Sequence, residues 1–256
     1  MVVSMSGRRA KQKRRIEKIS DSSIAGACLI ERSADAVLAV GFDDLALKDR
    51  IPQFAIGLCR AAFTQSKAIV MLASGGQLAA AAPNRRLFFE AALRLHWLAS
   101  LPKEERIQAT DTILDKERRD TANTISYLRD LGHDVDFNLE EMEAVLLDAP
   151  KKGTLQEQAR KLDAAVKAAD NQAWSIYATW REESKFSHAS GTLAGSYAPT
   201  LNQVTIGHGE PAPMDPELEA HQLTQHLIVA MTAQLLEDAG LGPDIAQRIP
   251  LAFYSV

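Results

Sequence analysis

The chain lacks the short motifs that mark several large enzyme classes. Its 256 residues contain no HExxH, no glycine-rich Walker loop and no GxSxG. These motifs bind zinc, cradle phosphate groups or expose a nucleophilic serine, so their absence excludes zinc peptidases, P-loop nucleotide hydrolases and α/β-hydrolases. Any chemistry must come from side chains that the fold brings together.

Cysteine is scarce, and the sequence contains no pattern of metal ligands. Cys28 and Cys59 lie in separate predicted helices, without a Cys or His at zinc-binding spacing. His221 and His226 are five residues apart, which places them about 140° apart around a helix and does not suit a shared metal. We therefore expect a reduced, cytoplasmic protein without a metal ion or another cofactor.

A long uninterrupted apolar run is also missing. The longest apolar region, residues 53–83, is broken by Arg60, Lys67 and other polar residues, and it falls short of the roughly 20 apolar residues that span a membrane. The stretch SSIAGACLI follows a basic start, as in a secretory signal, but it runs directly into Glu31. We expect neither a membrane-spanning segment nor a signal peptide.

Charge is distributed unevenly along the chain. Residues 1–18 carry seven basic residues and one acidic residue, a net charge of +6, whereas the whole chain carries −4. This composition predicts a basic, disordered tail over residues 1–20 and an acidic body. Such a tail is either a solvated terminus or a contact for nucleic acid, in which case the body mediates protein contacts.

Apolar residues at helical spacing predict an all-α helical bundle that forms one domain over residues 21–256. The expected helices cover residues 24–40, 53–82, 82–100, 102–131, 142–148, 155–170, 171–188 and 215–240. Residues 189–214 are rich in Gly, Pro, Ser and Thr, which predicts a long irregular crossover loop, and the stretch NQVTI within it favours a small β-hairpin.

Turn and capping residues mark several helix ends. Gly75 and Gly76 are expected to kink or split the second helix, and Gly132 to stop the fourth. Asn138 and Glu141 have the spacing of a capping box, in which each side chain binds a free backbone N–H of the other residue.

The segment APNRRLFFEAALRLHWLAS, residues 82–100, is apolar nearly all round. This pattern is typical of a helix buried at the centre of a bundle, so its few polar residues are of interest. Arg86 and Glu90 are four positions apart on the side of Trp97, and they predict an ion pair that points partly inward. His96 is expected to be a core histidine with a hydrogen-bond partner rather than a ligand.

The stretch NQAWSIYATWREESKFSHAS predicts a second helix of interest, which gathers polar and aromatic side chains on one face. At 100° per residue, five side chains fall within about 80° of one another: Trp174, Tyr177, Arg181, Ser184 and His188. Histidine exchanges protons near neutral pH, arginine binds phosphate oxygens in a fork, and aromatic rings stack on bases. The face therefore suits a phosphodiester. Core packing of the aromatic rings, with His188 capping the helix end, explains the same pattern.

Polar side chains on a core-facing stripe are costly unless they have partners. We hypothesise that Arg86 and Glu90 face this stripe across a helix–helix contact, with Glu90 holding either Arg181 or His188. The pocket would then contain Arg181, Ser184 and His188 as catalytic residues, supported by the other four: Arg86, Glu90, Tyr177 and Trp174.

The segments NRRLFFEAALRLHWL and YATWREESKFSHAS together resemble an uncharacterised bacterial all-helical family of unknown function. Members of this family carry an Arg-x-x-x-Glu helix and a later Tyr followed by Ser-x-x-x-His. The matching residues are Arg86, Glu90, Tyr177, Ser184 and His188. The resemblance covers about residues 60–200, and it implies a helical fold but no activity.

Arg181 and His188 enclose the six residues EESKFS and are similar to the Arg-to-His motif of HEPN-superfamily ribonucleases. Glu182 stands where those enzymes usually carry Asn, Asp or His. The resemblance implies metal-independent RNA cleavage by a homodimer whose two motifs line a shared cleft, in bacterial defence or a stress response. His188 would transfer protons, and Arg181 would stabilise the phosphorane.

Two functions are therefore expected as alternatives. One is a HEPN-like ribonuclease or RNA-binding protein that works as a homodimer without metal. The other is a non-enzymatic helical binding or sensor module, whose polar pocket binds a small anionic ligand or is purely structural.

Overall fold

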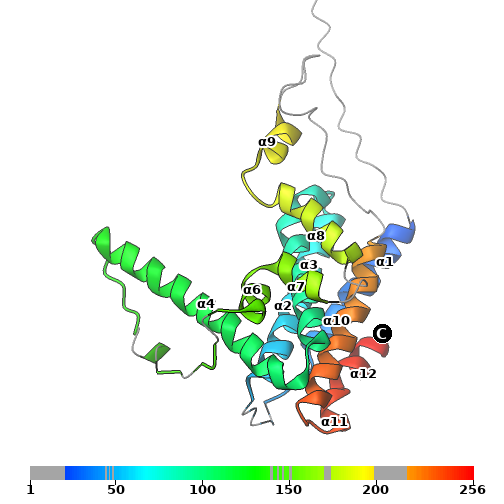
Figure 1. The fold of residues 1–256 in the computed structure, drawn as a ribbon. Coiled ribbons are helices and arrows are strands. Elements are labelled where there is room, and N and C mark those ends of the chain that lie inside the picture. Colours follow the sequence, from blue (N-terminus) through cyan, green and yellow to red (C-terminus); the bar gives the residue numbers. More distant parts are fainter. Residues whose placement is uncertain are drawn as a thin grey trace, which may run out of the picture.

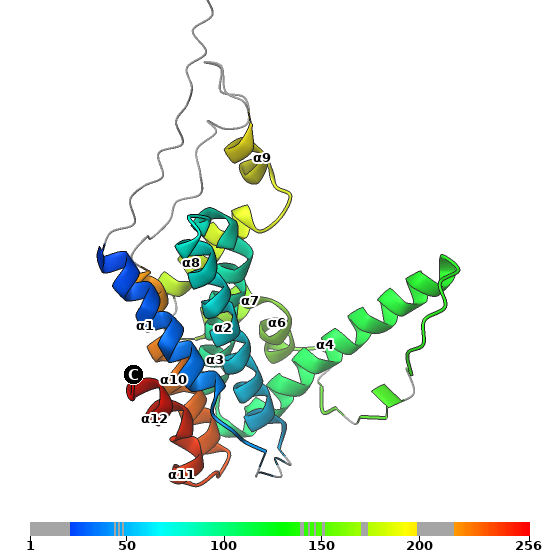
Figure 2. The same ribbon diagram turned by 180° about the vertical axis from the view of Figure 1, so that it is seen from behind.

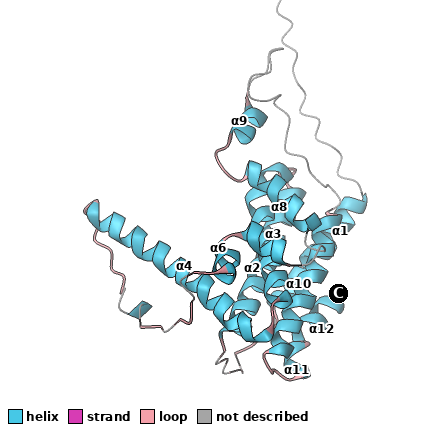
Figure 3. Cartoon of the chain, viewed as in Figure 1, coloured by secondary structure: helices cyan, strands magenta, loops and turns pink. Residues whose placement is uncertain are grey.

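The computed structural model describes residues 21–43, 45, 47, 49–138, 141–142, 144–145, 147–149, 152–169, 174–198 and 218–256. In these residues every regular element is a helix (Figure 3), which confirms the predicted all-α class. The longer helices are α1 (Asp21–Leu38), α2 (Arg50–Ser74), α3 (Ala82–Ser100), α4 (Lys103–Asp130), α8 (Trp174–Phe186) and α10 (Glu219–Asp238). The short ones are η1 (Leu78–Ala81), α6 (Thr154–Arg160), α7 (Leu162–Ala168), α9 (Gly191–Tyr197), α11 (Pro243–Ala246) and α12 (Arg248–Tyr254).

Three sequence predictions fall outside the described residues: the basic tail over residues 1–20, the β-hairpin in NQVTI and the helix start at residues 215–216. Within the described ranges, no helix is both long enough and apolar enough to cross a membrane.

Helix α3 lies at the centre of the fold. It packs against α2, α7, α8 and α10, while α1 covers the outer side of α2 and also contacts α12 (Figures 1 and 2). Phe88, Leu95 and Trp97 of α3 are fully buried. A buried aromatic side chain removes about 150–250 Å² from water, so α3 supplies much of the hydrophobic stabilisation. The predicted central helix is confirmed, and His96 is buried in it as expected.

The predicted helix ends are confirmed where glycine or a capping residue marks them. Helix α2 ends at Ser74, and Gly76 then adopts a left-handed φ of +67°, so the two glycines split the predicted segment. Gly132, with φ of +81°, ends α4 in the same way. The side chain of Asn138 accepts a hydrogen bond from the backbone N–H of Glu141 at 3.2 Å, as the predicted cap requires.

The single helix predicted over residues 155–170 is wrong. The chain is extended at Lys161, with φ of −119° and ψ of 117°, and this break separates α6 from α7. The two pieces pack in different directions, because α6 contacts α4 while α7 contacts α3 and α8. One straight helix could not bury both Ala159 and Ala165 against these separate neighbours.

The prediction of an irregular loop from residue 189 is also wrong at its start. Residues 191–197 form α9, whose N-terminus is capped by the Ser190 hydroxyl accepting from the N–H of Leu193 at 3.1 Å. After Gly240 the chain forms α11 and α12, where no helix was predicted. Ile249 and Phe253 of α12 lie four residues apart and are buried against the core.

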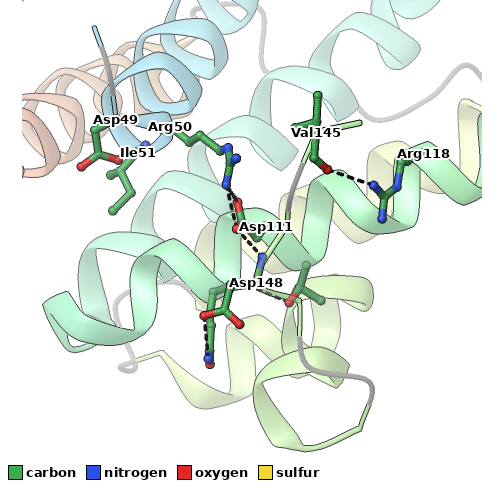
Figure 4. Close-up of polar contacts among 9 residues, drawn as sticks. Asp49, Arg50, Ile51, Asp111, Arg118, Val145 and Asp148 are labelled. Atoms are coloured by element: carbon green, nitrogen blue, oxygen red, sulfur yellow. Dashed lines mark hydrogen bonds and ion pairs between the residues drawn. The ribbon is translucent and has the colours of Figure 1, made fainter. Parts of the chain in front are cut away.

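Helix α4 packs on the body with its first half and projects away from it with its second half (Figures 1 and 2). Asp111, which is buried, accepts two hydrogen bonds from Arg50 Nη1 at 2.9 Å and one from the backbone N–H of Asp148 at 2.7 Å (Figure 4). Further out, Arg118 donates to the carbonyl of Val145 at 3.2 Å. These bonds tie both the start of α2 and the segment that returns along α4 to one helix.

We predict that Asp111→Ala lowers the free energy of unfolding by about 2 kcal/mol, because the backbone N–H of Asp148 and the Arg50 guanidinium lose this buried acceptor. Urea titration measures this change, and limited proteolysis near residue 148 should become faster. Asp120→Ala is the matched control on the projecting half of α4, since Asp120 is 64% exposed. If the two variants are equally stable, the Asp111 contacts do not support the fold.

Candidate functional site

The contact between α3 and α8 centres on a buried ion pair. Arg85 donates from Nε to Oε1 of Glu183 at 2.7 Å and from Nη2 to Oε2 at 2.8 Å, so the pair is bidentate. A third bond runs from Arg85 Nη1 to the carbonyl of Leu78. The two side chains are only 7% and 10% exposed, and each charge depends on the other because water does not reach them.

This pair was missed in the sequence, although a signal was present. Arg85 precedes Phe88 and Phe89 by three and four residues, the spacing of a buried helix face. The predicted packing of the helix over residues 82–100 against that over 171–188 is therefore confirmed, but Arg85 rather than Arg86 carries its buried charge.

Arg86 and Glu90 lie at the edge of this contact, and their side chains are 29% and 33% exposed. Their closest N–O distance is 4.0 Å. Oε2 of Glu90 accepts a hydrogen bond from Nε1 of Trp180 at 3.2 Å, and the Arg86 guanidinium lies 5.6 Å from the centre of the Trp180 ring.

The hypothesis that Glu90 holds Arg181 or His188 is wrong, because its partner on α8 is Trp180. Trp180 precedes Glu183 by three residues and shares its face of the helix. Arg181 lies about 100° further round. The Arg85–Glu183 pair thus turns Trp180 toward α3 and Arg181 away from it.

His188 does not lie on the predicted stripe, because α8 ends at Phe186. The Ser190 hydroxyl donates to the carbonyl of Lys185, and the backbone N–H of Ser190 donates to the carbonyl of His188 at 2.7 Å. His188 is therefore an exposed residue in the bend between α8 and α9. Trp174 is the first residue of α8, and its side chain lies outside the described part of the chain.

The rest of the stripe faces a shallow groove of about 430 Å³ between α7 and α8. The groove is lined by Leu162, Asp163, Tyr177, Trp180, Arg181, Ser184 and Lys185. Tyr177 is buried and stacks on Trp180, with ring centres 5.6 Å apart, so the partly exposed Trp180 is the more accessible ring. The Ser184 hydroxyl donates to the Trp180 carbonyl at 2.8 Å, which leaves its oxygen free to accept.

The charges of the groove are mixed. Among the described residues Arg181 forms no ion pair, and its exposed guanidinium lies 6.0 Å from the Tyr177 ring centre. Lys185 is held by both carboxylate oxygens of Glu182 at 2.7 and 2.9 Å, and Asp163 pairs with Lys167 at 3.6 Å. An incoming anion therefore meets Arg181 directly. Lys185 is released at little cost, since an exposed ion pair contributes about 0–1 kcal/mol.

A second polar cluster, which the sequence did not reveal, is buried between α2, α3 and α10. Nε2 of His221 lies 2.9 Å from the Ser66 hydroxyl, and Gln225 donates to the same hydroxyl at 3.3 Å. The His221 ring stacks on Phe88 with centres 3.7 Å apart. Burial, with a smaller effect from the nearby Arg85 charge, lowers the pKa of His221 from 6.5 to about 3. The imidazole is therefore neutral throughout the physiological range.

The described ranges contain neither a disulfide nor a cluster of potential metal ligands. Both cysteines are free thiols, and burial raises the pKa of Cys59 to about 12, so its thiol stays protonated. No group of three or more His, Cys, Asp or Glu side chains among the residues searched is arranged to hold a metal ion.

We predict that Glu183→Ala lowers the free energy of unfolding by about 3–5 kcal/mol, because it leaves the buried Arg85 charge without a partner. The neighbouring Glu182→Ala is the matched control, and it should change stability by less than about 0.5 kcal/mol since its carboxylate is exposed. Both are measured by urea unfolding. Equal effects would show that the pair does not join α3 to α8.

The stability of the fold should depend on pH through His221. His221 has a lower pKa in the folded than in the unfolded chain, so the folded chain binds fewer protons between pH 3 and 6.5. The stability contribution is fully present above pH 6.5 and is lost as the pH falls toward 3, by up to roughly 1.4 kcal/mol per pH unit.

Urea titrations of wild type and His221→Gln at several pH values between 4 and 7.5 test this. The variant should lose less stability on acidification, whereas His133→Gln, at an exposed position, should follow wild type. A His221→Gln variant with the wild-type pH profile would contradict the assignment.

Comparison with known proteins gives no independent indication of function. No protein-family model, curated protein or solved structure matches the chain.

Proposed function

We propose that the chain binds single-stranded RNA along α8 and cleaves it without a metal ion, as a HEPN-like ribonuclease. The observation that carries the proposal is the separation of roles on this helix. Glu183 and Trp180 are engaged by α3, whereas Arg181 and His188 project from α8 and from its end as exposed side chains. A cation and an imidazole open to solvent are the groups that phosphodiester cleavage uses.

Arg181 binds the phosphate in this proposal. Its guanidinium has no acidic partner within the described ranges and lies at a groove that also contains the Ser184 hydroxyl and Lys185. A guanidinium donates to two phosphate oxygens at once and stabilises the charge that develops on the phosphorane.

His188 transfers the proton. As a general base it removes the proton of the ribose 2′-hydroxyl, whose oxygen attacks phosphorus while the bond to the 5′-oxygen breaks. The leaving 5′-oxygen takes a proton from a second acid, which in a homodimer is the equivalent histidine of the other copy. The products are a 2′,3′-cyclic phosphate and a 5′-hydroxyl.

The groove also favours a second function, the binding of a small anionic ligand by a non-enzymatic sensor module. Its volume of about 430 Å³ lies within the range of small-molecule pockets, and it is lined by Arg181 and Ser184 but not by His188. Under this alternative Arg181 is required for binding and His188 is dispensable.

The test is cleavage of a labelled mixed RNA pool in the presence of a metal chelator. Wild type should leave 2′,3′-cyclic phosphate ends, and His188→Ala should reduce the rate by about 10²-fold or more while the circular dichroism spectrum is unchanged. Arg181→Ala should reduce cleavage as well.

His133→Ala and Arg119→Ala, at exposed positions away from the groove, are the matched controls and should cleave as wild type. Cleavage that survives His188→Ala, or no cleavage by wild type, would contradict the ribonuclease. RNA binding without cleavage, abolished by Arg181→Ala alone, would instead support the binding module.

A further inference from the structure

The Arg86–Glu90 pair has binding capacity that the described residues do not use. A guanidinium carries five N–H groups, yet the only acidic contact of Arg86 in the described part of the chain is the 4.0 Å approach to Glu90. Its Nε is buried and has no hydrogen-bond partner among the described residues. Because Nε is buried, a ligand from outside would bind the Nη groups of this side chain, which is 29% exposed.

Only one of the two carboxylate oxygens of Glu90 has a partner among the described residues. Its Oε2 accepts from Trp180 and faces Arg86, whereas no described residue donates to Oε1. One third of the Glu90 side chain is exposed, so this oxygen lies within reach of an external donor.

The pair is connected to the groove on α8 through aromatic rings. Arg86 lies over Trp180, Trp180 stacks on Tyr177, and Arg181 lies over Tyr177, with successive separations of 5.6, 5.6 and 6.0 Å. A cation thus stands at each end of this chain of contacts.

We propose that Arg86 and Glu90 form a second subsite for the same RNA, in which Arg86 binds a neighbouring phosphate and Glu90 Oε1 accepts a hydrogen bond from a ribose 2′-hydroxyl. The proposal rests on the proposed RNA-binding function and adds to it a preference for RNA over DNA. The 2′-hydroxyl is the group that distinguishes the two nucleic acids at a single site. The Glu90 carboxylate would accept a hydrogen bond from the 2′-hydroxyl of RNA. A DNA strand has no such donor at this position, so the carboxylate only repels its phosphates.

The experiment measures the affinity of a labelled single-stranded oligonucleotide, as RNA and as DNA of the same sequence, by fluorescence anisotropy. The full-length His188→Ala protein is used in a chelating buffer so that the RNA stays intact. This protein should bind RNA about tenfold more tightly than DNA, the size expected of one hydrogen bond to a charged group.

Glu90→Gln in that background should reduce the preference, because it weakens the hydrogen bond to the 2′-hydroxyl of RNA and also relieves the repulsion of DNA. Arg86→Gln should weaken RNA and DNA alike and lower the salt dependence of binding by about one phosphate contact. Glu182→Gln is the matched control for loss of an acidic charge, and it should leave the ratio of RNA to DNA affinity unchanged.

The outcomes separate the two proposals. If the parent protein binds neither nucleic acid, the RNA-binding function fails and the subsite fails with it. If RNA is bound but without preference over DNA, or if Glu90→Gln keeps the preference, the subsite alone is wrong. Should Glu90→Gln lose helical signal, Arg86→Gln decides the test, and an RNA affinity equal to that of the parent protein overturns the subsite.

Discussion

The buried Arg85–Glu183 pair is the interaction on which the arrangement of the site depends. Placing two charges in the interior is stabilising only when both are fully engaged, and the bidentate geometry with a third bond to Leu78 meets that condition. A bidentate pair also permits little rotation. It therefore decides which side of α8 faces α3 and which side faces the solvent.

The orientation of Glu183 determines where the other side chains of α8 lie. With Glu183 turned inward, Trp180 lies on the same side and reaches Glu90. Tyr177 stacks on Trp180 and closes the inner wall of the groove. Arg181, about 100° from Trp180, is left with its charge exposed. The groove thus results from the orientation that the ion pair gives to α8. Arg181 is its exposed cation because the contact with α3 does not use this side chain.

The buried polar residues of this core include a charged ion pair and a neutral histidine, and their surroundings explain the difference. Next to the Arg85 charge, His221 is kept neutral by burial and is accommodated by a hydroxyl, an amide and the face of Phe88. A protonated imidazole there would add a second positive charge to the interior without a new acceptor. Burial is the main cause, and the nearby Arg85 charge adds to it, so both favour a neutral imidazole at His221.

Much of the fold was determined by the sequence alone, because it depends on local signals. The apolar spacing of residues 82–100 identified the central helix, Gly76 and Gly132 marked helix ends, and Asn138 capped a turn as predicted. These features depend on backbone conformation and on the burial of one helix face, which neighbouring residues specify. Short helices such as α9 were missed because they bury too little apolar surface to show a period.

The positions of some candidate site residues were predicted correctly, for the same reason. The packing of α3 on α8 and the groove-lining positions of Tyr177, Arg181 and Ser184 followed from helical periodicity. Periodicity could not show that Arg85 and Glu183, 98 residues apart, form the buried pair, nor that α8 ends before His188. The ion pair depends on how two helices that are distant in sequence meet. The end of α8 depends on Ser190, the serine that caps the next helix. Only the tertiary structure decides such contacts, because the free energy of a charge depends on what surrounds it.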